Sequence, residues 1–189
     1  MILGSHNTMT YLTPDNKLLK LFSFLYKCQD ETISEQFNRG CRCFDLRIRL
    51  HKGNWVFAHG LFRSSDYQPM DILNILNALA VMNNEKLYIR LLLETKKYNK
   101  EQEEGFVEFC KSLKNKYFGN LIFFEGRRKY DWEILYDFGV YPNVVQYVGS
   151  MRSWYGKIWP KLYWAINIER DLQEASSQSD DTLCLFDFI

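Results

Sequence analysis

Strand-like and helix-like segments alternate along most of this chain, and this alternation constrains its fold more than any other feature. Residues 41–50 alternate between a polar side, which carries Asp45 and Arg47, and an apolar side. Apolar residues at helical spacing occupy 71–83 and 101–116. Strands that alternate with helices are typical of an α/β protein with a parallel sheet. Further strand patterns cover residues 55–58, 86–93, 119–124, 144–148, 163–168 and 183–188, and a further short helix is expected at 33–39.

The length of the chain limits how complete a parallel barrel can be. A TIM-type barrel commonly takes ~250 residues, and this chain has 189. We therefore predict an α/β fold, a small distorted TIM-type (β/α) barrel with reduced helices, the missing helices falling mainly between residues 125 and 163. We find no internal repeat and no linker, and expect one domain over residues 1–189 with a polar loop at 175–181.

The strand at 41–50 brings several polar side chains to one place. Alternate side chains of a strand point the same way, so Asp45 and Arg47 should face the barrel interior or the mouth of a cleft together. The turn at 51–54 folds the chain back into the strand 55–58, which ends at His59. We therefore expect His59 near Asp45 and Arg47.

Two of the three histidines have contexts that favour chemistry. His6 and His59 each follow a strand-like segment and lie close to a glycine, whereas His51 falls in a turn. Histidine is the side chain whose unperturbed pKa lies nearest neutrality, so a pair can share proton abstraction and donation. Either one alone could equally be a structural imidazole, but the pair beside Asp45 and Arg47 predicts an acid/base site.

Bulk composition excludes several classes of function. The chain has 24 Lys and Arg against 23 Asp and Glu, a net charge of +1 that will not steer it to nucleic acid. No apolar run approaches the roughly 20 residues that span a bilayer. The five cysteines are odd in number and lack zinc-finger spacing, so we expect reduced thiols. We find no leader pattern, and expect a cytoplasmic protein as the chain is given, or a secreted one if a leader was removed.

Three segments together resemble the catalytic X region of the phosphatidylinositol-specific phospholipases C, in order and spacing as well as residue type. They are 4–10 (GSHNTMT), 36–47 (QFNRGCRCFDLR) and 57–60 (FAHG). The last strand, 183–188, resembles the final barrel strand of that family with its acidic residue. The resemblance implies cleavage of a phosphodiester in which the inositol 2-hydroxyl attacks phosphorus, giving diacylglycerol and a cyclic inositol phosphate.

The resemblance also implies a role for each catalytic residue. His6 matches the general base, and Asp187 the carboxylate that orients it. His59 matches the general acid that protonates the leaving glycerol oxygen, and Arg47 matches the phosphate-binding arginine of the bacterial type. Asp45, on the same strand face, would hold Arg47 or His59 in place.

The residue at position 47 also bears on metal use. Eukaryotic-type relatives have an acidic calcium ligand there, so the resemblance of Arg47 to the bacterial type implies catalysis without a metal or other cofactor. Asn7 and Glu94, however, resemble eukaryotic-type ligands, and with Asp45 they offer the oxygen donors that calcium prefers. A calcium-assisted alternative therefore uses Asn7, Asp45 and Glu94.

Substrate contacts beyond the phosphate are less specific in the sequence. We take Asn7, Glu94, Lys96 and Arg128 as candidates, with Glu94 able to hydrogen-bond sugar hydroxyls if it binds no metal. Arg128 lies in a basic tripeptide after a strand, which can equally be a solvated turn. Lys96 is the weaker candidate because it belongs to a charge pair that is expected to be exposed.

The segment 151–164 mixes aromatic and basic residues, a composition that favours a membrane–water interface. The competing interpretation is that these aromatics close the barrel where helices are missing. The expected partner is an inositol phospholipid at a membrane surface, contacted by a peripheral protein that is a monomer and binds no nucleic acid.

Two other functions stay open at this point. A glycerophosphodiester phosphodiesterase-like barrel also uses paired histidines, but it normally adds a Glu-x-Asp metal pair where this chain has Asp45 and Arg47. A catalytically weak module that binds inositol lipid headgroups is the alternative from a different class.

Overall fold

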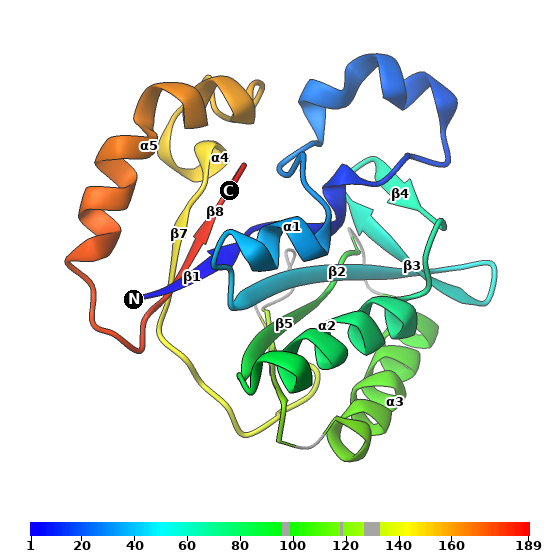
Figure 1. Ribbon diagram of the computed structural model, residues 1–189. Helices are drawn as coiled ribbons and strands as arrows, with labels where there is room; N and C mark the ends of the chain where they lie inside the picture. Colours follow the sequence, from blue (N-terminus) through cyan, green and yellow to red (C-terminus); the bar gives the residue numbers. More distant parts are fainter. Residues whose placement is uncertain (96–98, 118, 127–132) are drawn as a thin grey trace.

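The computed structural model describes residues 1–95, 99–117, 119–126 and 133–189. Its sheet curls into an incomplete barrel, in which the parallel strands follow the order β6-β5-β2-β1-β8-β7 (Figure 1). An antiparallel hairpin, β3 and β4, continues from the far half of β2. No pairing joins β6 to β7 among the described strands, so the barrel stays open there. The strands are β1 (Ile2–Ser5), β2 (Cys43–His51), β3 (Asn54–His59), β4 (Phe62–Ser64), β5 (Leu87–Leu93), β6 (Leu121–Glu125), β7 (Val144–Tyr147) and β8 (Leu183–Phe186).

Helices cover the outside of this curled sheet. The helices α2 and α3 pack beside β5 at the bottom of the view in Figure 1, and α5 covers the side of β7 and β8. Two 3-10 helices, η1 and η2, follow β1. The helices are η1 (Thr8–Tyr11), η2 (Lys17–Leu25), α1 (Ile33–Asn38), α2 (Pro69–Asn83), α3 (Lys100–Lys116), α4 (Gly149–Arg152) and α5 (Pro160–Ser176).

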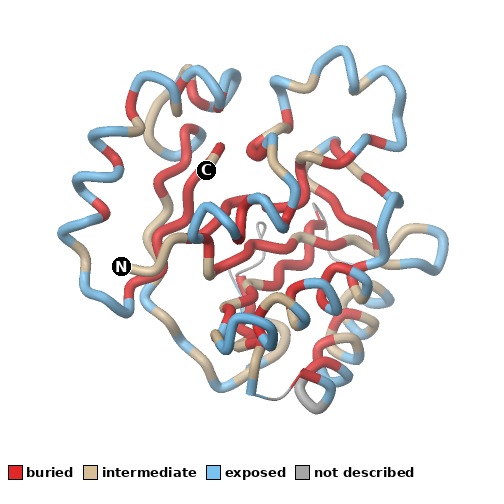
Figure 2. The backbone as a smooth tube through the Cα atoms, in the orientation of Figure 1, coloured by how far each residue is buried: buried red, intermediate tan, exposed pale blue. Residues whose placement is uncertain are grey.

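Successive side chains of β2 point to opposite faces of the sheet and pack into two separate parts of the interior. Phe44, Leu46 and Ile48 face outward into the main core under α2 and α3. Cys43 points the other way and packs inside the barrel against Leu185. The buried strands stand out against the exposed outer helix faces in Figure 2. This arrangement confirms the predicted division of the strand into an apolar face and a polar face.

Gly4 allows β1 to lie between its neighbours. A Cβ atom at this position would come within 2.5 Å of a side-chain atom of Leu185 and 3.0 Å of the Cβ of Cys43. A side chain here would force the Leu185 side chain to move and would crowd Cys43, so glycine suits this close approach of the strands. The close approach sets the position of the two residues that follow β1 and begin the site.

The predicted strand at 163–168 was wrong, because these residues belong to α5. Pro160 begins this helix at a position where its missing N–H costs nothing. Tyr163, Asn167, Asp171 and Ala175 then recur every four residues on the buried side. Because three of these four side chains are polar or only partly apolar, the segment lacks a helical hydrophobic pattern. The alternation at its start resembles that of a strand instead. Helix α5 also takes the first two residues of the predicted loop at 175–181.

The other predicted elements are found within one to two residues of their expected bounds. Within the span 125–163, where helices were expected to be missing, the described residues 133–148 contain no helix, but α4 and the first residues of α5 lie inside that span. The sequence analysis missed η1, η2, β4 and α4, all of them short. The five cysteines are free and buried, as expected. None of the described helices has the length and apolarity needed to cross a membrane.

Candidate active site

His6 and Asp187 meet where the ends of the chain lie side by side. Strand β1 pairs with β8 so that Ser5 lies opposite Phe186, and the next residue of each strand carries the functional side chain. Nδ1 of His6 lies 2.7 Å from Oδ1 of Asp187, and both side chains are buried. The parallel register therefore aligns the two groups although 181 positions separate them in the sequence.

Backbone contacts hold this pair in place. The side-chain amide of Gln29 donates to the carbonyl oxygens of both His6 and Phe186, at 3.0 Å and 2.9 Å, and so ties the two strand ends together. The N–H of Gly149 donates to the second oxygen of Asp187 at 3.2 Å. Gln29 thus fixes the backbone on which the two side chains stand, and Gly149 fixes the carboxylate oxygen that does not contact His6.

Arg47 determines which nitrogen of His6 carries the proton. Its Nη2 atom lies 2.8 Å from Nε2 of His6. A guanidinium can only donate hydrogen bonds, so Nε2 accepts with its lone pair and Nδ1 carries the proton that His6 donates to Asp187. This assignment follows from the hydrogen-bond network. It leaves His6 in the form of a neutral base whose lone pair points at the guanidinium.

Asp45 lies fully buried beneath Arg47. One of its oxygens accepts from Nε and Nη2 of Arg47 at 3.1 and 2.9 Å, and from the backbone N–H of Asn7 at 3.2 Å. Its other oxygen lies 3.7 Å from Arg90. Burial alone would raise the pKa of Asp45, but the positive charges of Arg47 and Arg90 outweigh it and hold that pKa well below its usual range. Asp45 is therefore a permanent anion that positions Arg47.

Replacing Asp45 with asparagine should make the free energy of unfolding fall less steeply as the pH is lowered. Because its folded-state pKa is depressed, Asp45 contributes stability that is complete above the unfolded value of about 4 and is lost as pH falls toward the folded value. Urea unfolding between pH 7 and 2 should show a steeper acid decline in the wild type than in Asp45→Asn. At pH 7 the variant should be less stable by about 3 kcal/mol, because the partly buried Arg47 and Arg90 lose their buried counter-charge. Equal acid slopes in the two proteins would contradict this account.

His59 and Glu94 complete the other side of the site. The rings of His6 and His59 are 6.5 Å apart between centroids, at 78° to each other. Glu94 accepts from the N–H of Gly60 at 3.1 Å and lies 3.7 Å from Nη1 of Arg47. A narrow cleft is lined by Arg47, His59 and Asn7. The guanidinium of Arg47 and the imidazole of His59 therefore face the same cleft.

Asn7 lies at the centre of the site in a left-handed backbone conformation, with φ of 49°. Asparagine tolerates this conformation better than most residues. The turn directs the Asn7 N–H to Asp45 and brings the Asn7 amide to 3.2 Å from Nδ1 of His6 and 3.5 Å from Nε2 of His59. Asn7 therefore joins both histidines to the Asp45 anion.

The oxygen donors expected for a calcium ion do not fit one as they are arranged. Asp45 already accepts three hydrogen bonds on one oxygen and faces Arg90 with the other. The Arg47 guanidinium lies against both Asp45 and Glu94. A divalent cation between these carboxylates would have to sit beside the positive charge of Arg47, which costs Coulomb energy.

The structure brings together seven of the nine predicted site residues. They are His6, Asn7, Asp45, Arg47, His59, Glu94 and Asp187. Lys96 and Arg128 lie outside the described residues. Sequence reasoning missed Gln29, Arg90, Gly149 and Cys28, whose Sγ accepts a hydrogen bond from Asn7. Of these four residues, only Arg90 is marked in the sequence, because it is a charged residue within an otherwise apolar strand.

Solved structures with a similar fold come from bacteria. The phosphatidylinositol-specific phospholipase C from Listeria monocytogenes is 15% identical, and the match covers 99% of this chain and 87% of that one with a TM-score of 0.63. A variant of the enzyme from Staphylococcus aureus is 13% identical, with 99% and 84% covered and a TM-score of 0.63. Another structure of the Staphylococcus aureus enzyme, from work on its membrane binding, is 16% identical. The match covers 97% of this chain and 70% of that one, with a TM-score of 0.58. These likenesses show the fold.

Sequence comparison gives the family. No curated protein matches the chain. The family model described as phosphatidylinositol-specific phospholipase C, X domain, matches residues 2–129, which is more than half of the chain and includes both histidines. The chain therefore belongs to the phosphatidylinositol-specific phospholipase C X-domain family.

Proposed function

We propose that this protein cleaves the phosphodiester of phosphatidylinositol, or of a related inositol lipid or anchor, and releases diacylglycerol and a cyclic inositol phosphate. One observation carries the proposal: Arg47 lies between the lone pair of His6 and the buried anion Asp45, at the cleft that His59 lines. A base, an anion-binding cation and a second histidine are the groups that this reaction requires.

Each group has one task in the proposed reaction. Nε2 of His6 takes the proton of the inositol 2-hydroxyl, and Asp187 stabilises the imidazolium that forms. The hydroxyl oxygen attacks phosphorus, and Arg47 holds the phosphate oxygens as they gain negative charge. His59 gives a proton to the glycerol oxygen as its bond to phosphorus breaks. The proton on His6 and the proton lost by His59 are exchanged with solvent, so both histidines return to their starting forms.

The direct test is release of diacylglycerol from phosphatidylinositol vesicles by the purified protein. Release of diacylglycerol supports the proposal, and absence of turnover with every inositol phospholipid and glycosyl-inositol anchor would overturn it. Metal-dependent hydrolysis of glycerophosphodiesters in place of phosphatidylinositol would favour the second barrel enzyme. Headgroup binding without turnover would favour a binding module.

We further propose that turnover needs no calcium. The guanidinium of Arg47 contacts the carboxylates that a calcium ion would need. The rate should therefore change by less than about twofold when excess chelator replaces added calcium, since a fixed guanidinium supplies the charge stabilisation. Activity that vanishes with the chelator and returns with calcium alone would show the calcium-assisted alternative to be correct.

The membrane-facing part of the protein is proposed to be an apolar rim around the site. We define the apolar rim as ten exposed side chains, Leu18, Leu21, Phe22, Phe24, Leu25, Met151, Trp154, Ile158, Trp159 and Leu162. The first five lie on η2, which follows the carboxyl end of β1, and the others lie after β7 or at the start of α5. The apolar rim therefore surrounds the end of the barrel that carries the site.

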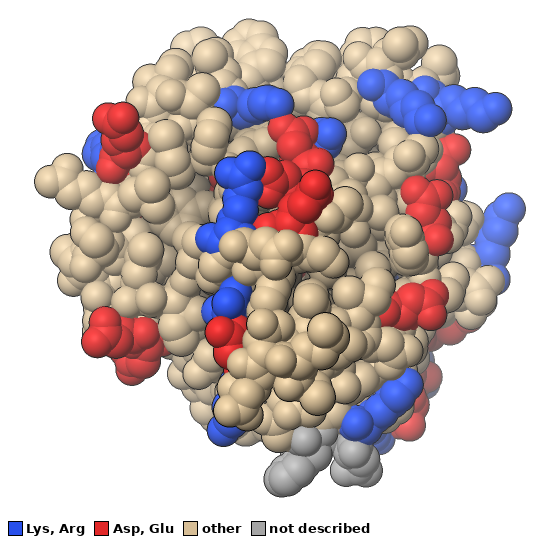
Figure 3. All heavy atoms as spheres, viewed as in Figure 1, with Lys and Arg blue, Asp and Glu red and all other residues tan. Residues whose placement is uncertain are grey.

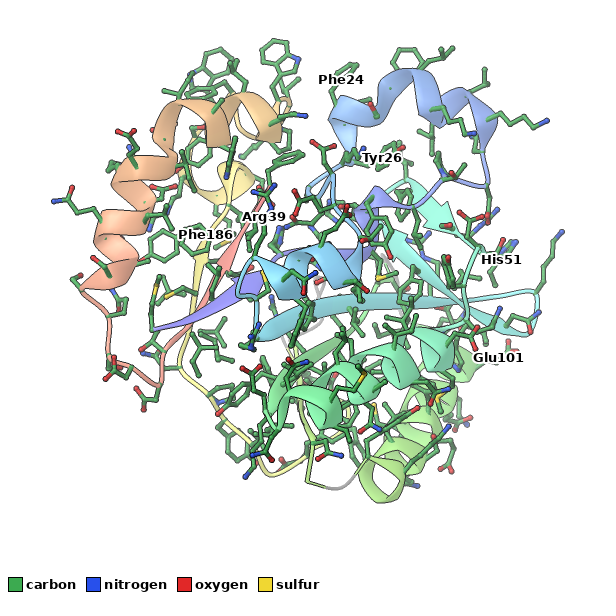
Figure 4. All side chains as sticks on the ribbon, in the orientation of Figure 1. Phe24, Tyr26, Arg39, His51, Glu101 and Phe186 are labelled. Carbon is green, nitrogen blue, oxygen red and sulfur yellow. The ribbon has the colours of Figure 1, made fainter. Side chains whose placement is uncertain are left out.

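The charges around the apolar rim suit a lipid surface. Lys27, Lys161, Phe24 and Trp159 line a groove between η2 and α5, in which Asp30 pairs with both lysines. Figure 4 labels Phe24 on the end of η2 that faces α5. Basic atoms lie at the upper right of Figure 3, where η2 runs, while the rest of that face mixes both signs. Aromatic and basic side chains placed together favour the interface between water and lipid.

Replacing Trp154 with alanine should weaken vesicle binding without weakening the chemistry. Trp154 is 74% exposed, so the folded protein should lose little stability. Removing a large aromatic from the lipid contact should lower the vesicle partition coefficient by about tenfold, measured by sedimentation with phosphatidylinositol vesicles. Turnover of a short-chain monomeric substrate should stay unchanged. Met82→Ser is the matched control, because Met82 is 81% exposed on α2 near the opposite end of the barrel. Equal loss in both variants would contradict this placement of the membrane surface.

A further inference from the structure

A third potential metal ligand lies against the histidine and aspartate of the site. The ligating atoms of His6, Cys28 and Asp187 all lie within 4.8 Å of one another, and all three residues are buried. Nitrogen, sulfur and carboxylate oxygen together form a donor set that zinc and related thiophilic divalent cations accept. Calcium, in contrast, prefers oxygen alone.

The Asn7 amide gives a second, independent indication of a ligand at this place. Its Nδ2 atom lies 3.2 Å from Nδ1 of His6 and 3.4 Å from Sγ of Cys28. Its Oδ1 atom is buried and has no hydrogen-bond partner among the described residues. Rotation of the amide by half a turn exchanges these two atoms. That rotation would place an amide oxygen beside the His6 and Cys28 donors, as a fourth ligand.

We propose that His6, Cys28 and Asp187, with the Asn7 amide, form an inhibitory site for a thiophilic divalent cation such as zinc. Zinc binds these donors at about 2.0 to 2.3 Å in a tetrahedron. The donors need to move by only about an ångström, because neighbouring ligands of such a tetrahedron lie roughly 3.5 Å apart. The metal would replace the 2.7 Å hydrogen bond between His6 and Asp187.

The proposed chemistry explains why binding would stop the reaction. The cation displaces the thiol proton of Cys28 and the Nδ1 proton of His6, and both protons leave to solvent. His6 then donates its Nδ1 lone pair to the metal, and Asp187 no longer stabilises an imidazolium. The loss of the base rests on the proposed function, whereas the binding of the metal does not.

The other cysteines supply a matched control. Cys184 is fully buried on β8, three residues before Asp187, but its side chain packs outside the barrel with Tyr147 and Phe186. Among the described residues, the group that contains Cys28 is the one that brings three metal-ligating side chains together. Cys184→Ala therefore removes a buried thiol near the site without removing a ligand.

Cobalt titration of the whole chain tests this site without any lipid assay. We expect one equivalent of Co²⁺ to give a thiolate-to-cobalt charge-transfer band with the wild type and with Cys184→Ala, and no band with Cys28→Ala. Calorimetry with Zn²⁺ should show an affinity at least about 100-fold lower for Cys28→Ala. Cys28→Ser, which keeps the side-chain size, serves as the second variant if Cys28→Ala does not fold.

Zinc inhibition of turnover, measured beside cobalt binding, distinguishes failure of the metal site from failure of the proposed function. Zinc should inhibit wild-type turnover and Cys184→Ala turnover at the same concentration, and inhibition of the Cys28 variants, relative to their own rates, should need at least about 100-fold more zinc. A wild type without a cobalt–thiolate band, or a Cys28 variant with wild-type zinc affinity, would overturn the site. A band without any lipid turnover would leave the site standing and contradict the enzyme proposal alone.

Discussion

His6→Ala is expected to lower phosphatidylinositol turnover by roughly 10³- to 10⁴-fold. Nε2 of His6 is the unprotonated atom that faces Arg47, and Nδ1 is fixed by Asp187 at 2.7 Å. Alanine removes the base and leaves Asp187 as a buried carboxylate without its histidine partner. The loss should appear in kcat, measured with a short-chain substrate in steady state, while KM changes little because the imidazole acts on the transition state.

His51→Ala is the control for this variant. His51 lies at the end of β2 in the hairpin turn, half-buried, and contacts Arg63 rather than any site residue that carries the chemistry. Its turnover should stay within about twofold of the wild type, since surface substitutions away from a site rarely change more. A His6→Ala protein that folds and retains more than about a tenth of wild-type turnover would rule out His6 as the general base.

Arg47→Lys is expected to lower turnover by about 10²- to 10³-fold while the charge is kept. Nη2 of the guanidinium contacts both His6 and Asp45, Nε also donates to Asp45, and Nη1 lies 3.7 Å from Glu94. A lysine ammonium has one nitrogen and cannot span these partners and a phosphate together. The effect should lie mainly in kcat, because the contact matters most when the phosphate oxygens gain charge.

Arg42→Lys provides the matched control for the arginine variant. Arg42 directly precedes β2, donates to the carbonyl oxygen of Phe37 and pairs with Glu85, away from the cleft. Turnover of Arg42→Lys should be close to that of the wild type, with only a small loss of stability. Binding of inositol lipid headgroups by Arg47→Lys should persist. Turnover within threefold of the wild type would show that Arg47 has no special role in the reaction.

The site was more predictable from sequence than the fold around it. His6, Arg47 and Asp187 lie on or directly after strands, and a strand fixes the direction of every second side chain. Once β1, β2 and β8 are parallel neighbours, their ends must bring these three groups together. The predicted face of Asp45 and Arg47 was confirmed for the same reason.

The parts that could not be predicted depend on long-range contacts or on short elements. Gln29 acts by bridging two carbonyl oxygens from opposite ends of the chain, and no local pattern marks such a residue. Helix α5 buries polar side chains such as Asn167 and Asp171, which hydrogen-bond to tyrosine hydroxyls and so give no apolar period. Helix η2 has no buried residue, so neither its position nor its exposed apolar side chains follow from a core pattern.

Phosphorus NMR of the reaction products tests the central claim most directly. Phosphatidylinositol in mixed micelles is incubated with the protein in excess chelator, and the first phosphorus-containing product is identified. Attack by the inositol 2-hydroxyl predicts a cyclic phosphodiester as the first product, together with an equal amount of diacylglycerol, both formed at least about 10³-fold more slowly by His6→Ala. A phosphomonoester as the first product would mean direct attack by water, and would contradict the account of His6, Arg47 and His59 given above.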